Sequence, residues 1–106
     1  MVVSYSEYEK RELETFKKFL SKLETFLEDK AVFKNAKPEV LYLHEPDWKD
    51  DVYYSRGVVK IGNLEYPVEI KFDTIDKVIR IRSEVLHLTL LKEEMEEFLN
   101  KGGKNE

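Results

Sequence analysis

Asp51–Asp73 reads DVYYSRGVVKIGNLEYPVEIKFD and is the stretch that decides the fold. Apolar and polar residues alternate on both sides of Gly62-Asn63, which predicts two strands joined by a two-residue loop. A loop that begins with Gly suits a type II′ turn, because the first central residue needs a positive φ, which Gly adopts without strain. The stretch therefore predicts one β-hairpin that turns at Gly62-Asn63.

The turn sets the register of the hairpin, beginning with Ile61 opposite Leu64. In this register one face is almost wholly apolar, with the pairs Val59 and Tyr66, Gly57 and Val68, Ser55 and Ile70, and Tyr53 and Phe72. The opposite face has the pairs Lys60 and Glu65, Val58 and Pro67, Arg56 and Glu69, and Tyr54 and Lys71. Opposite charges directly across a strand pair are stabilising, and a slip of one residue would move the charges into the core. We therefore expect one buried and one open face.

A long amphipathic helix is predicted before the hairpin, from Ser6 to about Asp29. Ser6 and Glu9 have the spacing of a capping box, which satisfies the first backbone donors of a helix. The apolar positions recur every three or four residues, at Leu13, Phe16, Phe19, Leu20, Leu23, Phe26 and Leu27. Between this helix and the hairpin, Val40–His44 predicts a short strand and Glu45–Asp51 a polar turn.

A third long strand and a last helix are predicted after the hairpin. Lys77–Arg82 alternates as a strand, and Glu84–Leu88 suggests that the strand continues past an irregularity near Ser83. Thr89 is the expected cap of a helix that ends at Gly102, a residue type that often follows the last turn. The apolar stripe of this helix is Leu91, Met95, Phe98 and Leu99.

This order of elements predicts an α+β fold. We expect a two-layer sandwich with an antiparallel sheet of about four strands and the N-terminal and C-terminal helices on one face, because only one face offers apolar surface to both helices. Residues 1–101 are expected to form a single domain and residues 102–106 a flexible tail. Gly57 and Ser55, in the middle of the apolar face, either leave space for a large helical side chain or mark a bulge.

Composition excludes several classes of function. The 106 residues include no cysteine, so disulfides, thiolate catalysis and cysteine-based metal sites are excluded. The chain has no apolar run near 18 residues and no charged-then-apolar leader, so we expect no membrane span and a cytoplasmic location. Charged residues make up 38% of the chain and glutamine is absent, a bias typical of proteins from heat-adapted organisms.

Charge is distributed unevenly along the chain. The net charge is −4, yet residues 52–83 contain six Lys or Arg and only four Asp or Glu. The predicted sheet is therefore the basic part of an acidic protein.

The open sheet face is the predicted binding site. Its chemistry-bearing residues are Tyr54, Arg56, Glu69, Lys71, Arg80 and Arg82. Tyrosine and arginine beside scattered apolar groups are typical of protein interfaces, and a self-complementary charge ladder suits a two-fold homodimer. We expect a small non-enzymatic module that binds a protein partner or a second copy of itself, without a cofactor and without a membrane.

Two alternatives use the same face. Aromatic and basic groups on antiparallel strands can stack and neutralise single-stranded nucleic acid, although acidic residues lie among them. Pro46-Asp47 followed by Glu69-Ile70-Lys71 resembles the signature of restriction-endonuclease-like nucleases, which implies a divalent metal held by an Asp and Glu69 with Lys71 beside the attacked phosphate. Against the nuclease, the predicted register places Arg56 rather than an aspartate opposite Glu69.

The polar turn carries five potential metal ligands: His44, Glu45, Asp47, Asp50 and Asp51. They lack the alternating spacing, central Gly and terminal Glu of a calcium loop. We interpret the segment as a surface turn anchored by Trp48, the only tryptophan.

Overall fold

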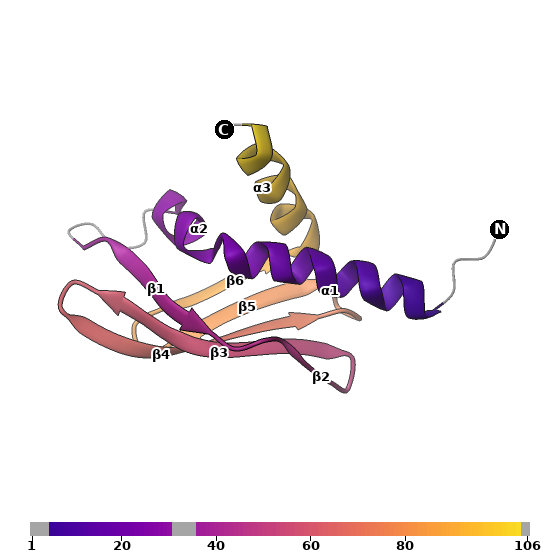
Figure 1. The fold of residues 1–106 in the computed structure, drawn as a ribbon, viewed down its shortest axis with the longest axis horizontal. Helices are drawn as coiled ribbons and strands as arrows, with labels where there is room; N and C mark the ends of the chain where they lie inside the picture. Colours follow the sequence, from indigo (N-terminus) through magenta and orange to yellow (C-terminus); the bar gives the residue numbers. More distant parts are fainter. Residues whose placement is uncertain (1–4, 31–35, 105–106) are drawn as a thin grey trace.

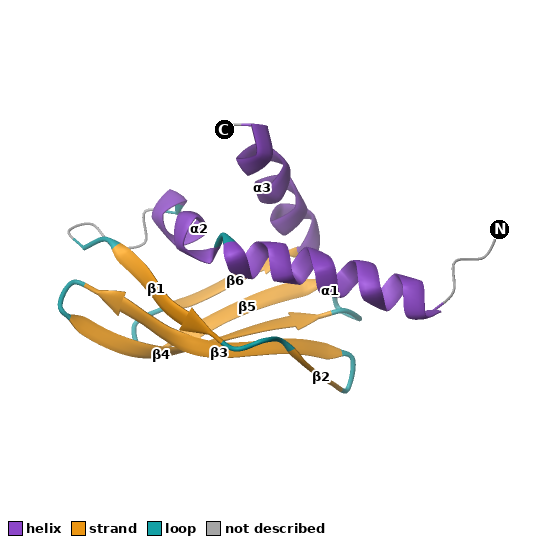
Figure 2. Cartoon of the chain, viewed as in Figure 1, coloured by secondary structure: helices purple, strands orange, loops and turns teal. Residues whose placement is uncertain are grey.

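The computed structural model describes the backbone of residues 5–30 and 36–104 and the side chains of residues 10–30 and 36–101 (Figure 1). The helices in these ranges are α1 (Tyr5–Ser21), α2 (Leu23–Asp29) and α3 (Lys92–Lys104). The strands are β1 (Pro38–Leu43), β2 (Asp47–Lys49), β3 (Val52–Ile61), β4 (Leu64–Asp73), β5 (Val78–Ser83) and β6 (His87–Leu91). Helices at both ends of an antiparallel sheet confirm the predicted α+β class (Figure 2). Among the described helices, none has the length and apolar character to cross a membrane.

The six described strands form one antiparallel sheet in the order β1-β3-β4-β5-β6. β2 also pairs with β3, beyond the end of β1, so β1 and β2 together make one edge of the sheet. β6 makes the other edge. The prediction of about four strands is wrong, because β2 and β6 were not foreseen.

The central hairpin has the predicted register along its whole length. Ile61 pairs with Leu64 and the pairing continues without interruption to Val52 and Asp73. Gly62 has a φ of +66°, while Asn63 is not in the positive-φ region, as a type II′ turn requires. The turn residue thus selects the face on which every side chain of β3 and β4 lies.

The core lies between the helices and one face of the sheet. Side chains without exposed area come from both, namely Phe16, Phe19, Leu23 and Leu27 from α1 and α2, Met95 from α3, and Val59, Ile70, Phe72, Ile79 and Ile81 from the strands. Burying a side chain of this size contributes about 1.5–3 kcal/mol. Figure 1 shows α1 lying along this face and α3 rising from the end of β6. The opposite face carries no described helix.

The predicted single N-terminal helix is interrupted at Lys22. The Lys22 N–H donates to the carbonyl of Phe19 at 3.0 Å, a tightened i to i−3 turn. After the interruption, Phe26 packs edge-on against Phe19 and against Phe98 of α3, with ring centroids 5.1 and 5.2 Å apart. The change of direction therefore joins α1, α2 and α3 through one aromatic cluster.

The segment after β5 also differs from the prediction. The strand does not continue past Ser83; the chain turns, with the Ser83 N–H donating to the carbonyl of Leu86, and returns as β6. Thr89 therefore lies within a strand and does not cap α3. The Glu94 carboxylate instead accepts a hydrogen bond from the Leu91 N–H at 2.8 Å, as the acidic residue of a capping box does.

The start of α1 and the end of α3 both differ from the predicted positions. α1 begins at Tyr5, one residue before the expected cap Ser6, and the predicted bonds of Ser6 and Glu9 lie outside the described side chains. α3 continues through Gly102, the predicted end, to Lys104. The division into a domain and a tail stays a prediction.

β2 occupies the segment predicted as a polar turn. Asp50 and Asp51 form the two-residue loop between β2 and β3, with φ values of 52° and 66°. Positive φ at both central positions is the mark of a type I′ turn, for which Asp is a favoured residue. Trp48 of β2 lies against Tyr53 with ring centroids 4.3 Å apart, so the expected anchoring of this segment by Trp48 takes place within a strand pair.

Gly57 accommodates an edge strand and not a helical side chain. The pairing of β1 with β3 shifts between Val40 and Tyr42, whereas the pairing of β3 with β4 runs through Gly57 without a bulge. A Cβ at Gly57 would lie 2.0 Å from the backbone oxygen of Tyr42 and 2.9 Å from the Cα of Leu43. The backbone of β1 therefore fills the predicted space.

Candidate functional site

The candidate site is the face of the sheet that points away from the core. We call it the open face and define it by the residues that alternate with the core residues of β3, β4 and β5. They are Val52, Tyr54, Arg56, Val58 and Lys60 on β3, Glu65, Pro67, Glu69, Lys71 and Asp73 on β4, and Val78, Arg80 and Arg82 on β5. None of them is buried, because no described helix covers this side of the sheet.

The six predicted site residues lie on two adjacent rungs of the open face. One rung runs Arg56, Glu69, Arg82 and the next runs Tyr54, Lys71, Arg80, each across β3, β4 and β5. Neighbouring strands are about 4.8 Å apart and same-face residues on a strand about 6.6 Å apart, so the six side chains form one continuous patch. We call this patch the central cluster.

Glu69 is the centre of the central cluster. Its Oε2 lies 3.3 Å from Nε of Arg56, across the strand pair, and its Oε1 lies 3.7 Å from Nζ of Lys71, on the same strand. The exposed fractions of the three side chains are 28%, 68% and 44%, respectively, so each pair contributes at most about 1 kcal/mol to folding. Both pairs remain accessible to a partner.

The central cluster is basic although the protein is acidic. Four cationic side chains surround the single carboxylate of Glu69, and Arg80 and Arg82 make no ion pair among the described side chains. Arg56 also lies over the ring of Tyr54, 5.9 Å from its centroid, an attractive cation–π arrangement. The surface can therefore offer arginine and tyrosine to a partner together.

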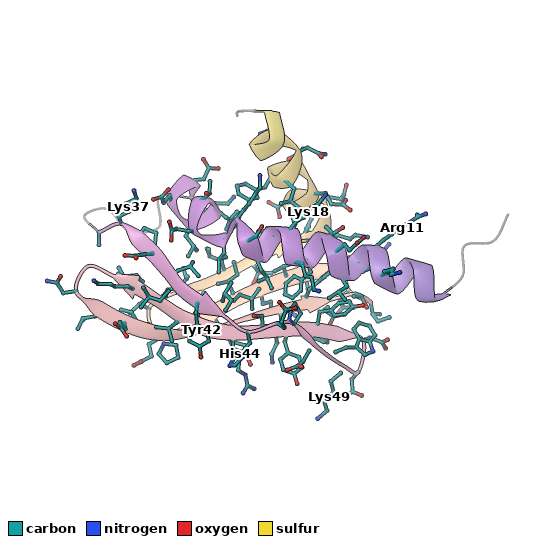
Figure 3. All side chains as sticks on the ribbon, in the orientation of Figure 1. Arg11, Lys18, Lys37, Tyr42, His44 and Lys49 are labelled. Atoms are coloured by element: carbon teal, nitrogen blue, oxygen red, sulfur yellow. The ribbon has the colours of Figure 1, made fainter. Side chains whose placement is uncertain are left out.

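The edge made by β1 and β2 extends the open face and was not predicted as part of it. Tyr42 pairs with Val58 and Asp47 pairs with Tyr54, which places both on the open side. The side chain of Tyr42 is 51% exposed, and its ring lies 5.4 Å from that of His44. Figure 3 shows Tyr42, His44 and Lys49 along this edge, away from Arg11 and Lys18 on α1. Their placement depends on β2 and on the irregularity of β1, for which the sequence gives only a weak signal.

The nuclease and metal-site alternatives find little geometric support. The register places Arg56 opposite Glu69 and places Asp47 two strands away from Glu69, on the neighbouring rung. Among residues 10–30 and 36–101, no three His, Asp or Glu side chains come together in a way that could hold a metal ion. The turn of Asp50 and Asp51 is explained by the β2–β3 hairpin.

The helix side of the molecule contains a shallow hollow of about 510 Å³ between α1 and α3. Its lining residues are Thr15, Lys18, Lys22, Glu96, Leu99 and Asn100. The Thr15 hydroxyl donates to the Arg11 carbonyl, and the lining contains no pair of carboxylates, so these side chains indicate no particular reaction. The central cluster is therefore the stronger candidate.

Comparisons with known proteins add no function. No protein-family model matches the sequence. No match was found among curated proteins or among solved structures.

Proposed function

We propose that this protein is a small non-enzymatic interaction module that binds a protein partner through the open face. The observation that carries the proposal is the central cluster, in which Tyr54, Arg56 and Glu69 lie together on uncovered strands. The proposal treats the domain as a two-layer sandwich, in which the helices cover one face of the sheet and a partner covers the other.

The mixture of side chains favours a protein partner. Val52 and Val58 are partly exposed and Pro67 is exposed beside the charged rungs, and they supply apolar area that a polyanion would not use. Protein interfaces combine such apolar groups with tyrosine and arginine. Charges of both signs lie on this face, which gives orientation and specificity to a protein contact more than it gives raw affinity.

Nucleic acid is the second candidate, and the excess of positive charge in the central cluster is the observation that favours it. Tyr54 offers a stacking surface, and four cationic side chains offer phosphate contacts. The net charge of −4 opposes long-range attraction of a polyanion, so this candidate ranks below the protein partner. Cleavage of labelled DNA that requires magnesium would instead support the nuclease alternative at Glu69 and Lys71.

Reversal of one charge distinguishes the two candidates, because it should change the affinity for a protein and the affinity for a polyanion in opposite directions. Glu69→Lys replaces the only carboxylate of the central cluster, so it should weaken a protein contact and strengthen binding of a polyanion. We expect proteins captured from native cells by the immobilised wild type to be lost with Glu69→Lys. Fluorescence anisotropy with labelled oligo(dT) at low and physiological salt should show that Glu69→Lys does not bind the oligonucleotide more tightly than the wild type does.

The matched control is Glu14→Lys, the same substitution on the exposed side of α1. This variant should retain the same proteins as the wild type, and circular dichroism should show that both variants are folded. Identical capture by Glu69→Lys and the wild type would reject the open face as the protein-binding site. Salt-sensitive oligo(dT) binding that rises with Glu69→Lys would support the nucleic-acid candidate.

A further inference from the structure

The cross-strand pairs at the centre of the open face are complementary in chemistry as well as in position. Opposite charges face each other in the pairs Lys60 with Glu65 and Arg56 with Glu69, apolar groups in the pair Val58 with Pro67, and an aromatic ring faces a cation in the pair Tyr54 with Lys71. No directly opposed pair of β3 and β4 on this face has two like charges. The same pairs can therefore also form between two copies of the chain.

A two-fold axis that runs parallel to the strands, above the line between β3 and β4, places β3 of one copy over β4 of the other. Because rotation about this axis keeps the position along the strand, each residue meets the counterpart of its own cross-strand partner. Arg56 would face Glu69 of the second copy, and Tyr54 would face Lys71. Further out, Asp47 of β2 would face Arg80 of β5. Each contact occurs twice, as symmetry requires.

Two other two-fold axes on this face bring like charges together. An axis centred on β4 would place Glu69 against Glu69 and Arg56 against Arg82. An axis perpendicular to the strands, between the two rungs of the central cluster, would place Arg80 against Arg82. Like-charge contacts at an interface disfavour association, so of these three axes the charge pattern of the sheet favours the one between β3 and β4.

We propose that the partner of the open face is a second copy of this chain, docked face to face about the axis between β3 and β4. This inference rests on the proposed function, since it names the partner of the same surface. Together with the β1–β2 and β6 edges, the face offers on the order of 20 residues, close to the number each partner contributes to a standard-sized interface. Two sheets in such a contact pack about 10 Å apart with strand directions within about 30°.

A pair of complementary charge reversals tests the axis. Arg56→Glu gives a chain with two acids in this β3–β4 pair, and Glu69→Arg gives a chain with two bases in the pair. Either variant alone would place like charges across the interface twice, whereas a mixture of the two would place opposite charges across it twice. In sedimentation equilibrium, we expect the wild type to be a dimer, each variant to dimerise at least about tenfold more weakly, and the equimolar mixture to form a heterodimer.

Two further proteins control for folding. The double variant Arg56→Glu/Glu69→Arg restores the pair both within the chain and across the axis, so it should dimerise like the wild type. Glu14→Lys changes charge on α1 and should leave the dimer unchanged. Circular dichroism and thermal unfolding of all variants establish that a loss of dimer is not a loss of fold.

The outcomes separate this inference from the proposed function. A wild type that stays monomeric at high micromolar concentration overturns the homodimer and leaves the capture experiment with Glu69→Lys to decide the protein-binding role. Variants that dissociate without rescue in the mixture overturn the axis while keeping the open face as the contact surface. Variants that remain dimers show that the copies associate elsewhere, which also overturns the inference.

Discussion

At the scale of single residues, the edge strand β1 leaves no room for a side chain at Gly57. A Cβ there would overlap the backbone oxygen of Tyr42, and neither backbone can move without disturbing the pairing of β1 or β4 with β3. We predict that Gly57→Ala lowers the free energy of unfolding by about 2–3 kcal/mol, the upper part of the range for overpacked sites. Urea unfolding followed by circular dichroism measures the change.

Gly62→Ala is the matched control for Gly57→Ala. Its added Cβ would make only an ordinary van der Waals contact, 3.9 Å from the Cβ of Ala36, so only the strain of the φ of +66° remains, about 1 kcal/mol. Equal costs for the two variants would contradict the steric explanation. The need for glycine at 62 could be predicted, because it follows from the hairpin register alone. The need at 57 could not, because it depends on a neighbouring strand and its irregularity.

At the scale of elements, the ion pair of Glu12 and Lys92 joins α1 to α3. Nζ of Lys92 lies 2.6 Å from Oε1 of Glu12, a residue only 5% exposed, and Oε2 of Glu12 has no hydrogen-bond partner among the side chains that the structure describes. We predict that Lys92→Met destabilises the fold by about 3–5 kcal/mol, because it leaves a buried carboxylate without its cation. Glu12→Leu/Lys92→Met removes both charges and should recover most of this loss. Urea unfolding of both proteins tests the pair, and a double variant no more stable than Lys92→Met would contradict this role.

The sequence predicted long elements with strong periodicity and missed short ones. Strand alternation over ten residues, joined by a Gly-Asn turn, determined the register of β3 and β4 and brought Tyr54, Arg56, Glu69 and Lys71 onto one face. The alternation in β5 added Arg80 and Arg82. β2 is only three residues long, and β6 lies in a segment whose apolar residues also suit a helix. The break at Lys22 leaves no mark in the apolar stripe, since residues on both sides of it are buried.

At the scale of the whole molecule, overall charge and surface charge act in opposite directions on a dimer. Each copy carries −4, so two copies repel, while the facing rungs of the open face attract. In Figure 1 the helices are stacked on the sheet along the 31 Å dimension of the molecule. Two copies docked through their open faces would therefore have their centres about 30 Å apart. Two charges of −4 at about 30 Å repel by about 2 kcal/mol in water without salt.

Salt screens these two terms at different concentrations, which gives a prediction for the dimer. The Debye length is about 30 Å at 0.01 M and about 10 Å at 0.1 M, so the repulsion between centres largely disappears over this range. The facing pairs are in contact and are screened appreciably only toward 1 M, where the Debye length is about 3 Å. We therefore predict that the dimer dissociation constant is lowest near 0.1 M NaCl and rises at both 0.01 M and 1 M. Sedimentation equilibrium at the three concentrations measures it. A dissociation constant that falls steadily up to 1 M would show that apolar contacts through residues such as Val58 and Pro67, rather than the charged rungs, hold the two copies together.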